Sequence, residues 1–353
     1  MTATVRADAT LLIADRDEGA TVYGRGFFGT PAPEGLVLDR FEGAYLLEMG
    51  RLAVANGRGT ALTFPQLFRR ANRAEPAFAR RYLVYRDLRQ RGYVVRSSPL
   101  PAVFSVLPRG GVLHKTPAKY WVDPISERIP FDLAKLSALA DRVHGAKKTL
   151  LLAMVDEESD LTYYKVRRPN PTGTLAPVRL AAPAEGWFVG DRVTVFDPAA
   201  VEAFGRGLAY GSRVGDRLEL SLLEAAHLIS EAQLVLVDGR TGRRLAPEVL
   251  LQRARRLDRS FDARLRTYRT LRDQNLVVKT GFKYGAHFRA YPRNPEQVHA
   301  RYLVHALAHD HVGAWPELAG RVRVAHGVRK EFLLAEVPPA GAVRYLSLER
   351  VRP

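Results

Sequence analysis

Three residues in the last quarter of this 353-residue chain carry side chains that could together cleave RNA without a metal ion. Tyr291 lies eight residues before His299, and Lys330 ends a Val-Arg-Lys triplet further along the chain. In such a reaction a general base takes the proton of a ribose 2′-hydroxyl, a general acid protonates the leaving 5′-oxygen, and a cation offsets the charge that develops at phosphorus. The spacing alone shows that three suitable groups lie within 40 residues of sequence.

The surrounding residues predict the elements that must position these side chains. Alternating apolar residues predict strands at 287–291 and 302–305, and an apolar run predicts a further strand at 332–337. Pro316 predicts the start of a helix, because the missing proline N–H costs nothing in a first turn. Each candidate residue therefore lies at, or just outside, the end of a predicted strand.

The chain also contains an internal duplication. The matching segments, offset by 182 or 183 residues, are 36–59 with 218–242, 85–95 with 268–278, and 142–155 with 323–337. A nearly constant offset over more than a hundred residues indicates two copies of one unit.

Each copy is predicted to hold helices followed by a strand-rich part. Asp39 with Glu42, and Ser221 with Glu224, have capping-box spacing, which predicts a helix start in each copy. The other predicted helices are about 64–72, 76–91, 247–256 and 258–275, with one opening at Pro130, and the other predicted strands are 94–96, 103–107, 120–123, 150–155 and 277–279.

These elements predict a fold of α+β or α/β class. The expected organisation is a first repeat at 1–168 (subdomains about 1–93 and 94–168), a linker at 169–190 in a stretch rich in Pro and Gly, and a second repeat at 191–353 (subdomains about 191–276 and 277–353).

Alignment of the two repeats shows which copy keeps the candidate chemistry. Leu107 stands opposite Tyr291 and Pro117 opposite His299, whereas Lys148 stands opposite Lys330. The first repeat therefore lacks both base and acid, and we expect it to be an inactive scaffold or RNA platform.

The stretch 281–330 resembles the catalytic half of the archaeal tRNA-splicing endonucleases. The matching features are the Lys-Tyr-Gly turn at 283–285, Phe-Arg-Ala-Tyr ending at Tyr291, His299 before a Tyr-Leu-Val strand, and Arg-Val followed by Val-Arg-Lys at 323–330. The resemblance extends over about residues 20–353 and implies a restriction-endonuclease-like mixed sheet in each C-terminal subdomain.

This resemblance implies a tRNA-intron lyase of the homodimeric two-repeat type, in which Tyr291 is the general base, His299 the general acid and Lys330 the stabiliser of the transition state. Such an enzyme excises introns from precursor tRNA at bulge-helix-bulge motifs and leaves 2′,3′-cyclic phosphate and 5′-hydroxyl ends. It needs no cofactor and no metal. Arg323 and Arg350 match arginines that stack on a bulge base.

The resemblance also implies a contact between two copies of the chain. Repeat one carries an acidic loop where repeat two has Pro-Pro-Ala-Gly-Ala, and in the family such a loop docks into a basic cleft of the opposing subunit. Its carboxylates are Asp156, Glu157, Glu158 and Asp160. From the residues alone, an acidic hairpin tip that only keeps a sheet edge soluble is the favoured interpretation, and only the resemblance favours docking.

Composition agrees with a polyanion-binding protein. The chain has 54 Lys and Arg against 37 Asp and Glu, a formal charge of +17, and the excess is spread over both halves. There is no cysteine, which excludes disulfides and thiol chemistry. The N-terminus lacks the apolar core of a signal peptide, and no apolar run approaches the ~18 residues of a membrane span. We expect a soluble, cytoplasmic protein without a membrane partner.

Several other interpretations of the same residues remain open. Tyr284 is a rival base, and His309 with His311 has the spacing of a strand-borne zinc site. The chain could be a non-catalytic, basic RNA-binding scaffold. A metal-dependent DNA nuclease is a further alternative, but from 279 to 330 the only acids are Glu296, Asp310 and Glu317.

Overall fold

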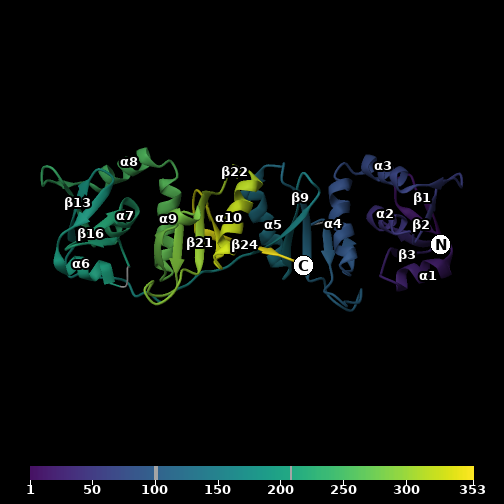
Figure 1. The fold of residues 1–353 in the computed structure, drawn as a ribbon, viewed down its shortest axis with the longest axis horizontal. Coiled ribbons are helices and arrows are strands. Elements are labelled where there is room, and N and C mark those ends of the chain that lie inside the picture. The colour runs from purple at the N-terminus through teal and green to yellow at the C-terminus, as the bar shows by residue number, and fades with distance from the viewer. Residues whose placement is uncertain (99–101, 207–208) are drawn as a thin grey trace. The chain divides into compact units, whose positions relative to one another are not determined.

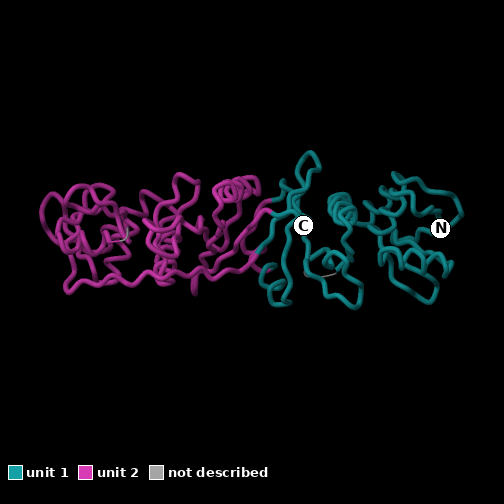
Figure 2. Tube along the Cα trace, turned by 60° about the horizontal axis from the view of Figure 1, so that its bottom comes forward, with its two compact units in different colours: residues 1–129, 139–166, 351–353 teal, residues 130–138, 167–350 magenta. Residues whose placement is uncertain are grey.

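The computed structural model describes residues 1–98, 102–206 and 209–353. The chain forms two compact units, coloured separately in Figure 2. Unit 1 comprises residues 1–129, 139–166 and 351–353, and unit 2 comprises residues 130–138 and 167–350. Each unit has an N-terminal subdomain with its own six-stranded sheet and a C-terminal subdomain with a further set of paired strands (Figure 1).

Unit 1 holds the first repeat. The elements of its N-terminal subdomain are β1 (Thr2–Val5), β2 (Leu11–Ile13), α1 (Arg16–Gly24), β3 (Thr30–Ala32), β4 (Gly35–Leu38), α2 (Arg40–Glu48), β5 (Ala53–Ala55), β6 (Ala61–Leu62) and α3 (Phe64–Ala74). Those of its C-terminal subdomain are α4 (Phe78–Gln90), β7 (Val95–Ser97), β8 (Phe104–Val106), β9 (Tyr120–Ser126), most of α5 (Leu133–Gly145), β11 (Thr149–Val155) and β12 (Leu161–Arg167).

Unit 2 holds the second repeat. The elements of its N-terminal subdomain are β13 (Ala184–Val189), β14 (Arg192–Val195), α6 (Pro198–Gly205), β15 (Ser212–Val214), β16 (Arg217–Ser221), α7 (Leu222–Ser230), β17 (Leu234–Asp238), β18 (Arg244–Leu245) and α8 (Pro247–Leu257). Those of its C-terminal subdomain are β10 (Phe131–Asp132), α9 (Phe261–Asp273), β19 (Val277–Thr280), the 3₁₀ turn η2 (Phe282–Tyr284), β20 (Phe288–Tyr291), β21 (Tyr302–Ala308), β22 (Val312–Gly313), α10 (Trp315–Gly327), β23 (Glu331–Val337) and β24 (Arg344–Val351).

The strand order of the two small sheets confirms the duplication. The first runs β3-β4-β2-β1-β5-β6 and the second runs β15-β16-β14-β13-β17-β18. In each sheet the pair formed by the fourth and fifth strands in this order is parallel, β1 with β5 and β13 with β17, and the pairings on both sides of it are antiparallel. The α+β fold class predicted for both repeats is therefore confirmed.

Both predicted capping boxes are present and open equivalent helices. The Asp39 carboxylate accepts from Glu42 N at 2.8 Å, and the Glu42 side chain accepts from Asp39 N at 2.9 Å. Ser221 and Glu224 make the same reciprocal pair at the start of α7, at 3.3 and 2.9 Å. Each box satisfies two backbone donors that the first turn would otherwise leave without partners.

The long helix α9 joins the two sheets of unit 2 into one core. It packs against α7 on one side and against β19, β21 and β23 on the other (Figure 1). Its buried face, which includes Phe261, Leu265, Tyr268 and Leu271, belongs to the large apolar cluster of this unit. The C-terminal sheet that carries the candidate residues thus rests on a rigid support.

Two predicted boundaries differ from the structure. Pro130 does not open a helix: Phe131 and Asp132 form β10, which pairs with β22, and α5 begins only at Leu133. The amide of Leu133 donates to His311 O at 3.1 Å, and this pairing holds the preceding backbone extended. The second difference is at the end of the range 169–190, which the composition predicts as linker. Residues Ala184–Val189 in this range form strand β13 instead, because they pair with β14 and β17.

Within the three described ranges, no helix is both long enough and apolar enough to cross a membrane.

Candidate active site

Three strand ends of unit 2 meet at one edge of the C-terminal sheet. β20 is antiparallel to β21, with Ala290 opposite Tyr302, and β21 is parallel to β23, with Tyr302 opposite Glu331. Arg301 links the three ends, because its N–H donates to Ala290 O at 3.1 Å and its carbonyl accepts from Glu331 N at 2.9 Å. The C-terminal end of β20 and the N-terminal ends of β21 and β23 therefore share this edge.

The candidate residues all lie at this edge. Tyr291 is the last residue of β20, His299 precedes β21 by three residues, and Lys330 immediately precedes β23. The topology thus brings together three positions that are spread over 40 residues of sequence.

The ring of Tyr291 is held by packing. Tyr291 is only 7 % exposed and forms a small apolar cluster with Val277 and Ala300, the residue that follows His299. The guanidinium of Arg289 lies 5.8 Å from the centre of the Tyr291 ring. The ring therefore has a fixed place next to the segment that carries His299.

His299 is exposed, in the connection between β20 and β21. A turn closes this connection, because Asn294 O accepts from Gln297 N at 3.0 Å and from Val298 N at 3.2 Å. The imidazole is therefore open to solvent on a segment whose two ends are tied to the sheet. It can reach a bound molecule without moving the fold.

The end of helix α10 determines the backbone position of Lys330. Its N–H donates to Ala325 O at 2.9 Å, and the preceding Arg329 has the left-handed φ of 54°. The first repeat ends α5 in the same way, with Lys147 at φ 55° and the amide of Lys148 on Val143 O at 3.1 Å. The lysine position is thus a property of the duplicated helix ending.

The structure also places Tyr284 beside Lys330. The Lys330 ammonium lies 5.7 Å from the centre of the Tyr284 ring and 3.4 Å from Val328 O. Tyr284 ends η2, and a hydrogen bond from Arg321 on α10 to Gly285 O ties this turn to the helix. The sequence suggests Tyr284 as a rival base but does not predict that it lies near Lys330. That proximity depends on how the turn at 282–285 folds back toward α10.

A groove next to Lys330 is lined by several cations. Its volume is about 660 Å³, and its walls come from α10, from the start of β23 and from β24. The basic side chains in its lining are Arg167, His326, Arg329, Lys330 and Arg350. Lys330 and Arg350, predicted separately, therefore face one groove. Arg323 is exposed on α10, three residues before His326.

Arg167 is a groove residue that the sequence analysis missed. It forms an ion pair of 2.6 Å with Glu349, and each of these side chains is about half exposed. Arg167 belongs to the strand that ends the first repeat, so its distance in sequence from Lys330 gives no sign that the two share a groove.

The acidic loop of unit 1 is a compact, exposed hairpin tip between β11 and β12. The carboxylate of Asp156 accepts from the amides of Glu158 at 3.0 Å and Asp160 at 2.8 Å, which shapes the turn. Glu157 pairs with Arg128 at 3.0 Å, and both of these side chains are exposed. The loop presents its remaining carboxylates to solvent.

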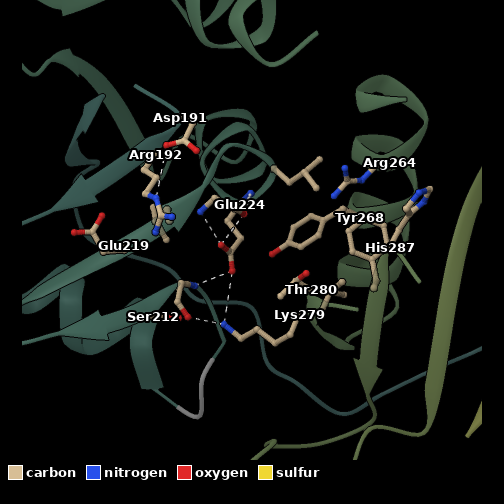
Figure 3. A pocket seen from close by; sticks show the side chains of 16 residues that line it. Asp191, Arg192, Ser212, Glu219, Glu224, Arg264, Tyr268, Lys279, Thr280 and His287 are labelled. Carbon is tan, nitrogen blue, oxygen red and sulfur yellow. Dashed lines mark hydrogen bonds and ion pairs between the residues drawn. The ribbon is translucent and has the colours of Figure 1, made fainter. Parts of the chain in front are cut away.

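A second hollow of unit 2 lies between the small sheet and α9 (Figure 3). Its volume is about 410 Å³. Figure 3 shows Arg192 on one wall and Arg264 on another, with Lys279 and Glu224 below them. The Lys279 ammonium donates to Gly211 O at 2.8 Å and lies 3.6 Å from the Glu224 carboxylate, and burial lowers the pKa of this lysine.

The first repeat has the same polar link. Arg96 occupies the place of Lys279 and donates to the Glu42 carboxylate at 2.7 Å, while burial raises the pKa of Glu42 to about 7. A link present in both repeats ties each N-terminal subdomain to the C-terminal subdomain of the same repeat.

One of the two histidines considered for zinc has another partner. His309 Nδ1 lies 2.6 Å from the carboxylate of Glu336, a side chain that is fully buried. Among the residues that the structure describes, no three histidine or acidic side chains come close enough to hold one metal ion. The carboxylate cluster that a metal-dependent nuclease requires is likewise missing from this described part.

A duplicated α+β chain that brings the three candidate residues to one sheet edge in its second repeat fits a class of two-repeat nucleases. Two family models each match the chain twice. The tRNA intron endonuclease catalytic C-terminal domain matches residues 78–163 and 261–345, and the tRNA intron endonuclease N-terminal domain matches 5–68 and 184–251.

Similar curated proteins span almost the whole chain. The tRNA-splicing endonucleases of Methanosarcina acetivorans and Methanosarcina mazei are 36% and 37% identical to it, over 97% of the chain and 97% and 96% of those proteins. The tRNA-splicing endonuclease of Natronomonas pharaonis is 35% identical over 94% of both chains. The chain belongs to the tRNA intron endonuclease family, and the prediction of an enzyme of this family is confirmed.

Proposed function

We propose that this chain excises introns from precursor tRNA, by cleaving RNA at bulge-helix-bulge motifs through attack of a ribose 2′-hydroxyl. The observation that carries the proposal is the meeting of Tyr291, His299 and Lys330 at one sheet edge, beside a groove lined by cations. The relatives named for tRNA splicing support the choice of substrate.

Each side chain has one role in this proposal. The Tyr291 oxygen accepts the 2′-hydroxyl proton while the 2′-oxygen forms a bond to the adjacent phosphorus. The bond from phosphorus to the 5′-oxygen breaks, and His299 donates a proton to that oxygen. The Lys330 ammonium offsets the extra negative charge of the phosphorane. The products are a 2′,3′-cyclic phosphate and a 5′-hydroxyl.

Arginine side chains provide the proposed contacts to the bulge. Arg350 in the groove and Arg323 on α10 present planar guanidinium groups, which stack on any base. Stacking of this kind suits a substrate that is recognised by shape, since it does not depend on base identity.

We further propose that the enzyme is a homodimer held by the acidic loop. A bulge-helix-bulge motif has two cleavage points, whereas one chain has one set of candidate residues, so a two-fold dimer matches the substrate. Glu157, Glu158 and Asp160 of one copy would dock in the hollow of Figure 3 in the other copy, where Arg192 and Arg264 offer cations.

A non-catalytic RNA-binding scaffold is the alternative that shares most of these features. The test uses one labelled RNA with a bulge-helix-bulge and a second RNA in which both bulges are closed by pairing. The proposal predicts cleavage of the first RNA at both bulges and no cleavage of the second. Tight binding of both RNAs without cleavage would leave the scaffold as the better description.

A further inference from the structure

The connection between the two repeats is attached to the catalytic edge of the second repeat. Three consecutive amides of this connection donate to backbone carbonyls: Gly173 N to Gln274 O at 2.8 Å, Thr174 N to Pro292 O at 2.8 Å, and Leu175 N to Asn275 O at 2.9 Å. The Thr174 hydroxyl also donates to Pro292 O, at 3.3 Å. Pro292 directly follows Tyr291.

The connection comes so close to the backbone of Asn275 and Pro292 that position 173 has no room for a side chain. A Cβ atom there would lie 2.2 Å from Asn275 O and 2.9 Å from Pro292 O, both of them backbone atoms. Neither atom can move without shifting the start of β19 or the residue after Tyr291. The glycine is therefore needed to let the connection touch both places at once.

Leu175 extends this attachment to the side chains of the site. It packs against the small cluster of Val277, Tyr291 and Ala300, in which Val277 is fully buried and the other two nearly so. Without Leu175 the Tyr291 ring would lose one of its few packing partners. Ala300 would lose support next to His299.

We propose that residues 173–175 form a positioning segment of the catalytic site. The hydrogen bonds of this segment fix Pro292, and the Leu175 side chain fixes the ring of Tyr291. The proposed base therefore keeps its position and orientation relative to the segment that carries His299. This inference rests on the proposed function, in which Tyr291 is the base. The join between the repeats thus has a part in the reaction besides connecting them.

The test is single-turnover cleavage of bulge-helix-bulge RNA at saturating enzyme, together with RNA binding measured separately. Leu175→Ala and Gly173→Ala should each slow cleavage by about tenfold to a hundredfold, since displacing a catalytic group by ~1 Å costs that much. RNA affinity should stay within twofold of the wild-type value. Leu175→Met, which keeps the volume, should restore most of the rate.

A matched control is Gly145→Ala in α5 of the first repeat. A Cβ atom at Gly145 would meet nothing within 4 Å, so this substitution should leave the cleavage rate within twofold of wild type. Equal losses in Gly173→Ala and Gly145→Ala would overturn the inference.

A double substitution separates positioning from general damage to the fold. If Leu175 acts through Tyr291, Leu175→Ala should cost little or nothing when Tyr291→Phe is already present. A full, additive loss in that background would overturn the role of the segment. If Tyr291→Phe alone cleaves as fast as wild type, the assignment of the base fails, and the inference fails with it. If Tyr291→Phe cleaves slowly but Leu175→Ala and Gly173→Ala cleave as fast as wild type, the assignment of the base stands and only the positioning role of residues 173–175 fails.

Discussion

At the scale of single residues, the proposed mechanism makes Tyr291 and Tyr284 competitors for the role of base. Tyr291 ends β20 beside the His299 segment, whereas Tyr284 lies near Lys330. Tyr291→Phe should reduce single-turnover cleavage by about 10²- to 10⁴-fold, because it removes general-base catalysis. Tyr284→Phe should reduce it by less than about tenfold, since it keeps the ring beside the ammonium. The reverse order of effects would move the base to Tyr284.

Lys330 and Lys148 allow a test in which one residue of a matched pair is the control. Both follow the same left-handed helix ending, but the partners proposed for Lys330 are absent in the first repeat. Lys330→Ala should lower the cleavage rate roughly a hundredfold at saturating RNA, the usual effect of losing one charge-stabilising donor. Lys148→Ala should leave the rate unchanged. Similar losses in both variants would indicate a structural role for the lysine.

At the scale of elements, His227 makes α7 sensitive to acid. Its ring stacks on Tyr210 at 6.0 Å and meets Tyr268 edge-on at 5.6 Å. Burial lowers the pKa of His227 to about 4, so that the folded protein holds it neutral. Its counterpart in the first repeat, Tyr45, makes the same two contacts with rings at 6.0 and 6.1 Å.

This comparison predicts the effect of His227→Tyr. The unfolded chain takes up a proton near pH 6.5, but the folded chain does so only near pH 4, so this histidine's contribution to stability is lost as pH falls between these values. The variant should match wild type in urea unfolding at pH 7. It should be more stable at pH 5 by about 1 to 2 kcal/mol. Parallel losses in both proteins would show that His227 does not titrate in this range.

Helices and strands are predicted correctly from the sequence where the contacts that form them lie close together in the chain. The capping boxes at Asp39 and Ser221 open α2 and α7 as predicted, because all of their bonds lie within four residues. Prediction fails at Pro130, where β10 forms instead of a helix because its partner β22 lies about 180 residues away.

The same reason limits prediction of the site. The motif residues Tyr291, His299 and Lys330 can be named from sequence, and adjacent strands place them at one edge. The sequence does not predict that Leu175 approaches Tyr291 or that Arg167 lies in the groove. Each of these depends on contacts between segments more than a hundred residues apart.

At the scale of the whole molecule, the account requires two copies of the chain. Replacing Glu157, Glu158 and Asp160 by the corresponding amides removes charge but keeps Asp156, whose carboxylate shapes the turn. If the proposed dimer forms, this triple variant should dissociate to monomers at concentrations where the wild type stays dimeric, because its loop would lose the proposed attraction to the cations of Figure 3. Light scattering after size-exclusion chromatography measures the change.

Glu248→Gln, at an exposed position early in α8, is the control and should leave the dimer intact. An unchanged dimer in the triple variant would remove the acidic loop from the assembly. A dimer that dissociates while cleavage at both bulges continues would show that one chain acts alone.

The central claim is metal-independent cleavage by side chains at the catalytic edge. Its most direct test is cleavage of labelled bulge-helix-bulge RNA in excess EDTA by wild type and by His299→Ala, with the chemistry of both new ends mapped. The account predicts 2′,3′-cyclic phosphate and 5′-hydroxyl ends at both bulges for wild type and a rate about 10²- to 10⁴-fold lower for the variant. Cleavage that appears only after Mg²⁺ is restored, or an unchanged rate in His299→Ala, would contradict it.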